Sequence, residues 1–133
     1  MIDVYIPEET IPTEDHGKVL KQLTEALLKW TDATELPIAR DNTMAYLHVL
    51  PAAHVTAGGK PAVYVRIDVK VPKVVLSTIE RRRGFIADAT DIVSALSIGG
   101  HDSQRTWVTI SNTADGGWGL GGHGLTNAEL DDI

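Results

Sequence analysis

The chain has 133 residues, 43% hydrophobic side chains and a formal net charge of −6 at pH 7, the composition of one globular domain large enough to bury a core. The acidic excess argues against nucleic acid as a partner, because phosphate binding depends on Lys and Arg. No apolar run is long enough to cross a membrane and no signal-peptide pattern begins the sequence, so we expect a cytoplasmic protein without a membrane partner. The absence of cysteine excludes disulfides and cysteine-based zinc sites.

A short repeat organises the whole chain. Residues 2–8 read IDVYIPE and residues 67–73 read IDVKVPK, so that four residue types coincide at a fixed spacing. Similar patterns follow both copies, and self-similarity at a fixed period indicates one structural unit written twice. We therefore predict a single domain over 1–133, built from pseudo-repeats of about 1–60 and 61–133.

The first repeat is predicted to contain a strand, a helix and a second strand. Ile2, Val4 and Ile6 alternate with polar residues, which is typical of a strand with one buried face, and Pro7 ends it. Thr13 is the predicted N-cap of the helix. The apolar stripe of this helix is Val19, Leu20, Leu23, Leu27 and Trp30. A polar connection, a second strand and a loop or hairpin follow, over 31–42, 43–50 and 51–60.

The second repeat follows the same plan from Pro61 onward. Alternating valine and isoleucine over 63–71 predict a strand, and Ser77 with Glu80 predicts a capping box at the start of a helix. The apolar stripe of this helix is Phe85, Ile86, Ala89, Ile92, Val93 and Leu96. A polar connection, a last strand and a glycine-rich hairpin follow, over 97–105, 106–111 and 116–122.

Two strand–helix–strand units define the expected fold. A helical crossover makes the two strands of each unit parallel, with a right-handed connection. Joining the units gives an α+β fold, an α/β sandwich with a four-stranded mixed sheet and two helices on one face. The other sheet face is polar but also aromatic, and carries Asp3, Tyr5, Tyr64, Arg66, Asp68 and Lys70. We expect other copies of the chain to cover it in a closed ring.

Two further patterns concern ligand binding. Gly119, Gly121 and Gly124 satisfy a dinucleotide-binding spacing, but no helix and βαβ unit follow them, which favours a hairpin that needs positive φ. The five histidines lack the spacing of metal ligands, and His48, in an alternating strand, is better explained as a hydrogen-bonded packing residue. We therefore expect neither a metal nor a cofactor.

Two stretches carry a resemblance to a known family. Residues 47–59, LHVLPAAHVTAGG, and residues 106–122, TWVTISNTADGGWGLGG, together with the doubled βαβ plan, resemble the tautomerase superfamily of 4-oxalocrotonate tautomerase and macrophage migration inhibitory factor. The resemblance covers nearly the whole chain and implies a homotrimer whose sheets line a central channel. It also implies a proton-transfer isomerase of small 2-oxo or unsaturated carboxylic acids.

The resemblance places the catalytic position at Met1 and Ile2. In this superfamily an N-terminal proline, exposed by removal of the initiator methionine, is a base whose pKa is lowered by a dry pocket. Ile2 stands at that position, and a bulky second residue is expected to leave Met1 in place. The candidate base or imine former is then the primary α-amine of Met1, with an ordinary pKa of about 7.7 to 8.0.

The resemblance also implies substrate-binding residues. Arg40 matches a basic residue before the second strand and would hold a carboxylate, although an ordinary loop arginine is an equally good interpretation. Trp107 and Thr109 match positions in the last strand. Trp118 matches the aromatic residue of the glycine-rich hairpin and is also suited to subunit packing.

Two functions follow from these residues. One is a proton-transfer isomerase that uses the Met1 amine, with a small carboxylate as its ligand. The other is a non-catalytic trimer that keeps the fold as a binding or structural module. Ile2 favours the second function, whereas Arg40 and Trp118 favour the first.

Overall fold

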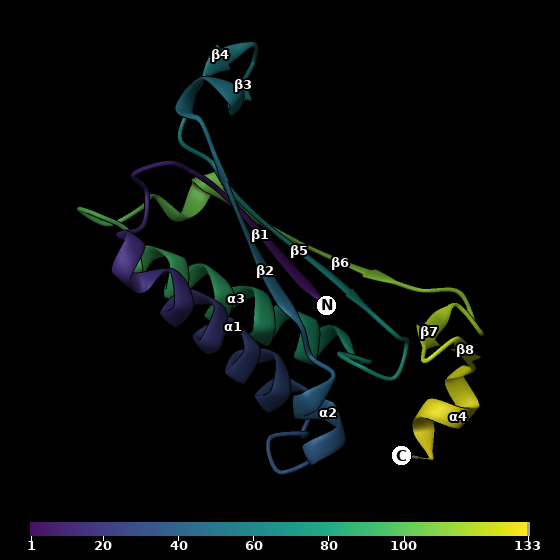
Figure 1. Ribbon diagram of the computed structural model, residues 1–133. Helices are drawn as coiled ribbons and strands as arrows, with labels where there is room; N and C mark the ends of the chain where they lie inside the picture. The colour runs from purple at the N-terminus through teal and green to yellow at the C-terminus, as the bar shows by residue number, and fades with distance from the viewer. Residues whose placement is uncertain (133) are drawn as a thin grey trace.

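The computed structural model describes residues 1–132 and contains one four-stranded sheet with the strand order β2-β1-β5-β6 (Figure 1). Its strands are β1 (Ile2–Pro7), β2 (Ala45–Leu50), β5 (Val65–Val71) and β6 (Thr106–Asn112). β1 is parallel to β2, β5 is parallel to β6, and the central pair β1 and β5 is antiparallel. The predicted mixed sheet is therefore confirmed.

Two long helices cover one face of this sheet. α1 (His16–Trp30) connects β1 to β2, and α3 (Ile79–Leu96) connects β5 to β6. The two helices contact each other and form a single layer (Figure 1). The tandem βαβ units and the α+β fold class are thus as predicted. None of the helices over residues 1–132 is long and apolar enough to cross a membrane.

The core forms where the inward side chains of the central strands meet the helices. Ile2 and Val4 of β1 are fully buried, as are Ile67 of β5, Leu23 of α1 and Phe85 of α3. Each such side chain contributes roughly 1.5 to 3 kcal/mol of hydrophobic stabilisation relative to exposure. The apolar faces predicted from the strand alternation and from the helical stripes therefore pack against each other in one core.

The two repeats are related by an approximate two-fold axis between β1 and β5. Ile2 lies opposite Val69 and Val4 lies opposite Ile67, so each repeat presents equivalent residues to the other in reverse order. Equivalent features of the repeats consequently lie at opposite ends of the sheet.

Each repeat carries a short hairpin that projects from the sheet (Figure 1). The first hairpin is β3 (Thr56–Ala57) with β4 (Lys60–Pro61), and the second is β7 (Trp118–Leu120) with β8 (His123–Leu125). Their turns are formed by Gly58-Gly59 and Gly121-Gly122, all at positive φ, which only glycine adopts without strain. This confirms that the glycine-rich stretch is a hairpin.

The helix starts differ from the prediction. Thr13 makes no cap and lies in the 3-10 turn η1 (Thr13–Asp15), whose own hydrogen bonds satisfy the early amides. The N-cap of α3 is Thr78, whose hydroxyl accepts a hydrogen bond from the Arg81 amide, so the predicted capping box at Ser77 is one residue too early.

Several short elements were not predicted. They are α2 (Pro37–Asp41), η2 (Ala52–His54), η3 (Ser103–Arg105) and α4 (Asn127–Asp131). The hydroxyl of Thr43 donates to the carbonyl of Ala39 at the end of α2, at 2.6 Å. β2 therefore begins at Ala45, two residues later than expected.

The contact between α1 and α3 depends on a glycine. A Cβ atom added to Gly84 of α3 would lie 2.3 Å from the Trp30 ring of α1. The indole Nε1 of Trp30 donates to Asp88 at 2.8 Å, which fixes the ring against α3. The helices therefore approach closely only because position 84 lacks a side chain.

We predict that Gly84→Ala destabilises the protein by about 1 to 3 kcal/mol, because the methyl group displaces the indole ring. The matched control is Gly17→Ala near the start of α1, where an added Cβ meets nothing within 4 Å. Denaturant unfolding should show a loss of stability for the first variant and none for the second. Equal effects of the two substitutions would contradict the packing argument.

Candidate functional site

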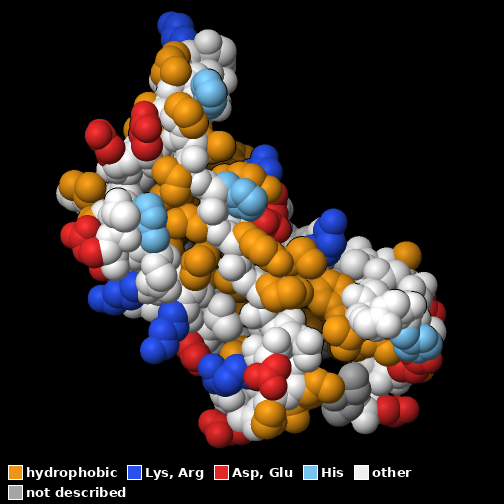
Figure 2. Space-filling view, in the orientation of Figure 1, with side chains coloured by type: hydrophobic (Ala, Val, Ile, Leu, Met, Phe, Trp, Pro, Cys, Tyr) orange, Lys and Arg blue, Asp and Glu red, His pale blue; other side chains and the backbone are white. Residues whose placement is uncertain are grey.

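A cavity of about 400 Å³ opens between the end of α1, α2, the β7–β8 hairpin and α4. We call it the Met1 groove, because Met1 lines it. Its other lining side chains are mainly apolar and include Leu27, Leu36, Ile38, Val75, Trp118 and Leu125. In Figure 2 hydrophobic side chains gather between the body of the molecule and the C-terminal segment that contains β7, β8 and α4.

The residues with charged groups that line the Met1 groove are Met1, which carries the α-amine, and two aspartates, Asp32 and Asp131. Asp32 is paired with Arg81 of α3 at 2.6 Å. Among residues 1–132 no Lys or Arg side chain lines the groove. Within one chain, the groove is therefore better suited to a neutral molecule than to an anion.

The N-terminus continues β1 between its two neighbouring strands. The Met1 amine donates to the carbonyl oxygen of Lys70 at 3.0 Å, and the Lys70 amide donates back to the Met1 carbonyl. Burial lowers the pKa of the Met1 amine below its usual 8.0, and the nearby carboxylate of Asp3 partly opposes this shift. At neutral pH the amine is therefore a free base more often than an ordinary α-amine.

Ile2 contributes no reactive group to the groove. Its side chain is fully buried in the core below the sheet, and its amide donates to the carbonyl of Met44, just before β2, at 2.8 Å. The residue at the expected proline position thus anchors the strand that carries the Met1 amine.

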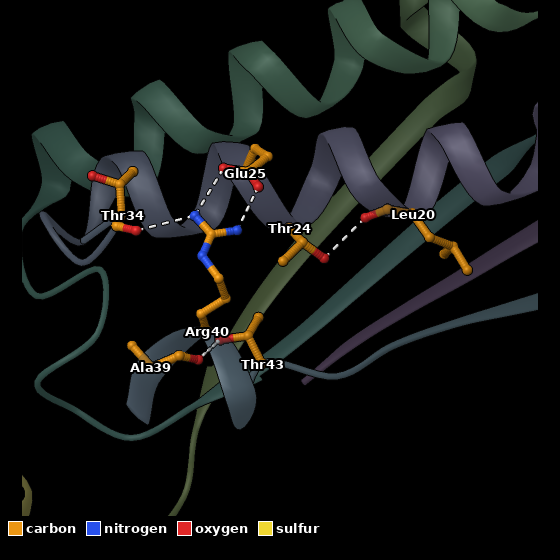
Figure 3. A network of polar contacts seen from close by, with 7 residues as sticks. All are labelled: Leu20, Thr24, Glu25, Thr34, Ala39, Arg40 and Thr43. Atoms are coloured by element: carbon orange, nitrogen blue, oxygen red, sulfur yellow. Dashed lines mark hydrogen bonds and ion pairs between the residues drawn. The ribbon is translucent and has the colours of Figure 1, made fainter. Parts of the chain in front are cut away.

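Arg40 lies in the last turn of α2, where its side chain turns toward α1. Its Nη1 and Nη2 atoms lie 2.6 and 3.3 Å from the two carboxylate oxygens of Glu25, and Nη2 also donates to the carbonyl of Thr34 (Figure 3). The hydrogen bond from Arg40 lowers the pKa of Glu25. Ala39 and Asn42 line the groove on either side of Arg40 in sequence. Arg40 itself is therefore beside the groove and already paired.

The remaining predicted residues do not lie together in one chain. Trp118 lines the Met1 groove. Trp107, on the edge strand β6, is 62% exposed, and the hydroxyl of Thr109 donates to Asp68 at 2.7 Å on the polar sheet face. Within one chain the structure brings Met1 and Trp118 together but places Trp107, Thr109 and Arg40 elsewhere.

Several groove residues were missed in the sequence. Leu36 and Ile38 at the start of α2, and Leu130 in α4, line the cavity. Both helices have five residues, which is too short for a helical period to be recognised. One signal was readable, because Thr126 and Glu129 form a capping box at the start of α4.

No protein-family model and no curated protein sequence matches the chain. Solved structures do match it. A native fused 4-OT is 21% identical, with 98% of each chain covered and a TM-score of 0.77. N1, a member of the cis-3-chloroacrylic acid dehalogenase family, is 16% identical, with 98% of this chain and 87% of that chain covered and a TM-score of 0.78.

The fold is tautomerase-like. FG41 malonate semialdehyde decarboxylase shares it as well, at 16% identity and a TM-score of 0.70 over 100% of this chain and 97% of that chain. The resemblance seen in the sequence is thus confirmed for the fold. In the tautomerase-like fold of this chain, Met1 and the Trp118 hairpin share one cavity.

We predict that the Met1 amine titrates below 8.0 and that Asp3→Asn lowers its pKa further, because the carboxylate stabilises the ammonium form. Acetylation rates across pH, read by mass spectrometry of the N-terminal peptide, give the pKa, with lysine peptides as internal references. Glu14→Gln, an exposed carboxylate elsewhere, should leave the titration unchanged. A pKa at or above 8.0, or a rise in Asp3→Asn, would contradict the assignment.

Proposed function

We propose that the chain is a tautomerase-superfamily protein whose Met1 α-amine transfers a proton on a small enolisable carbonyl compound. One observation carries this proposal: Met1, whose α-amine has its pKa lowered by burial, lines a mainly apolar cavity of about 400 Å³. A base with a pKa near the working pH is the most effective proton carrier, since it both accepts and returns the proton.

The proposed reaction moves one proton. The free amine accepts the hydroxyl proton of the bound enol, and the resulting ammonium delivers a proton to carbon, which gives the keto form and restores the amine. The apolar wall formed by Leu27, Val75 and Trp118 keeps water from competing for the proton.

The expected carboxylate substrates, 2-oxo and unsaturated acids, remain part of the proposal with Arg40 as their cation. Binding by Arg40 requires its guanidinium to leave Glu25, where it makes contacts of 2.6 and 3.3 Å. Both groups of that pair are exposed, and exposed ion pairs are typically worth about 0.2 to 1 kcal/mol. A substrate carboxylate therefore competes with Glu25 at a modest cost.

A homotrimer is the proposed assembly. Within residues 1–132 both outer strands of the sheet, β2 and β6, have one edge without a partner strand, and such edges are normally covered. Tyr46 on β2 and Trp107 on β6 are large exposed side chains at these edges. Solved structures with this fold include symmetric and asymmetric trimers of fused 4-OT.

A non-catalytic trimer is the second candidate function. It is favoured by the pairing of Arg40 with Glu25 and by the absence of Lys and Arg side chains from the groove lining over residues 1–132. In this alternative the groove binds a molecule without transforming it.

We expect the intact protein to convert phenylenolpyruvate or its uncharged methyl ester to the keto form, and acetylation of the α-amine to abolish the reaction. Intact-mass measurement first establishes that Met1 carries the amine. A faster reaction of the ester than of the acid would show that the groove works without a cation. Rates equal to buffer for both compounds would eliminate the isomerase and leave the binding module.

Light scattering should give three times the chain mass of 14.4 kDa, which is about 43 kDa. Tyr46→Glu should lower this mass, because it places a charge on the sheet face and edge that the partner copies cover. Ile79→Glu, at a similarly exposed apolar residue on α3, is the control and should leave the trimer intact. A monomeric mass for the unmodified protein would refute the assembly.

A further inference from the structure

The basic run Arg81-Arg82-Arg83, at the start of α3, holds two segments that line the Met1 groove. Arg81 contacts the end of α1, next to the lining residues 31–33. Arg82 donates to the carbonyl of Leu76 at 2.8 Å, next to the lining residues 74–75. Arg83 is exposed. The proposed proton transfer by Met1 uses none of these three cations.

The Arg81 guanidinium is held on one side by the backbone and on the other by a groove residue. Its Nη1 donates to the carbonyl of Trp30 at 2.9 Å, and its Nη2 lies 2.6 Å from Oδ2 of Asp32. Trp30 is fixed in turn, because it ends α1 and its indole donates to Asp88 at 2.8 Å. The backbone contact therefore keeps the guanidinium in place when Asp32 moves, and Nη2 can then meet another carboxylate.

Asp32 is the more exposed member of this pair. Its side chain is 76% exposed, against 34% for Arg81. Its backbone has a φ of 56° and its amide donates to the carbonyl of Lys29 at 3.2 Å. The carboxylate can turn into solvent by rotation about side-chain bonds, with no change in that backbone. Because exposed ion pairs contribute little stability, a ligand carboxylate can replace Asp32 on Arg81.

The position of Asp32 connects this ion pair to the groove. Asp32 lines the cavity together with apolar neighbours such as Leu28 and Ala33. An acid group that replaces Asp32 therefore lies at the groove wall, with the rest of its molecule against apolar side chains. Arg40 differs, because its partner Glu25 lines a separate hollow between α1 and α3. Arg81 is thus better placed than Arg40 to serve a ligand of the groove.

We propose that Arg81 selects acids for the Met1 groove: its guanidinium binds the ligand carboxylate, and Asp32 occupies the same nitrogen in the absence of a ligand. Arg81 is then a specificity-determining residue, and the substrate class is a small 2-oxo acid with an apolar body. The inference rests on the proposed function for the role of the groove as a substrate site. It does not depend on the chemistry of the Met1 amine.

The test measures binding to the full chain by calorimetry. The ligand is benzoylformate, a 2-oxo acid that cannot enolise because no hydrogen stands next to its ketone, and its methyl ester is the uncharged analogue. Arg81→Gln should weaken binding of the acid about tenfold or more, since charge-assisted hydrogen bonds are lost, and should leave the ester unchanged. Asp32→Asn should strengthen binding of the acid by about twofold to fivefold, because it removes the competing ion pair.

The Asp32→Asn substitution suits this position, because asparagine also accepts a left-handed backbone. Asp32→Asn combined with Arg81→Gln should bind the acid no better than Arg81→Gln alone, because Asp32 acts through Arg81. A gain that persists in the double variant would show that Asp32 only repels the acid, and would overturn the proposal.

Three matched controls each remove one positive charge. Arg83→Gln lies in the same run, Lys73→Gln lies between the lining residues Pro72 and Val74, and Arg40→Gln removes the other paired arginine. All three should bind benzoylformate normally, and circular dichroism establishes that every variant is folded. The proposal is overturned if the unmodified chain does not bind the acid, if Arg81→Gln binds it normally, or if a control loses as much affinity as Arg81→Gln.

Kinetics separate this inference from the isomerase. Arg81→Gln should raise KM for phenylenolpyruvate about tenfold and leave kcat/KM for its methyl ester unchanged. Arg81-dependent binding of benzoylformate without any enol-to-keto turnover would support the role of Arg81 and refute only the isomerase. Turnover of phenylenolpyruvate with the same KM in Arg81→Gln would refute only the role of Arg81.

Discussion

The antiparallel pairing of β1 with β5 is the constraint on which the rest of the structure depends. It joins the two repeats through their equivalent strands, with Ile2 opposite Val69 and Val4 opposite Ile67. All four side chains are almost completely buried, so a shift of register by one residue would turn this apolar set out of the core. The pairing therefore fixes the core and places equivalent features of the two repeats at opposite ends of the sheet.

The same register creates an electrostatic conflict on the polar face. Asp3 lies directly opposite Asp68, and like charges at directly opposed positions destabilise a sheet. Each carboxylate has its own local partner, His48 at 2.8 Å for Asp3 and Arg66 at 2.9 Å for Asp68. Two local clusters thus offset the repulsion between the strands. His48 is the hydrogen-bonded packing residue that the sequence predicts.

The predictable part of this molecule is the part governed by period and repetition. Local patterns predict the strands, both long helices and the glycine turns. The repeat then indicates that the four strands form one sheet. The pairing of Arg40 with Glu25 could not be predicted, because it depends on α2, a helix of five residues. The position of Trp107 opposite Arg66 likewise arises from the register of β5 and β6, which no local pattern in the chain specifies.

The repeat places two different groups, the Met1 amine and the Arg66 guanidinium, at equivalent positions of the sheet. The pKa of the Met1 amine is lowered by burial, so protons can leave and return near neutral pH. A guanidinium has N–H donors but no acceptor, and Arg66 is paired with a carboxylate oxygen of Asp68 at 2.9 Å. The amine end should therefore respond to pH around neutrality. Of the two equivalent positions, the first therefore carries the group suited to exchanging protons with a ligand.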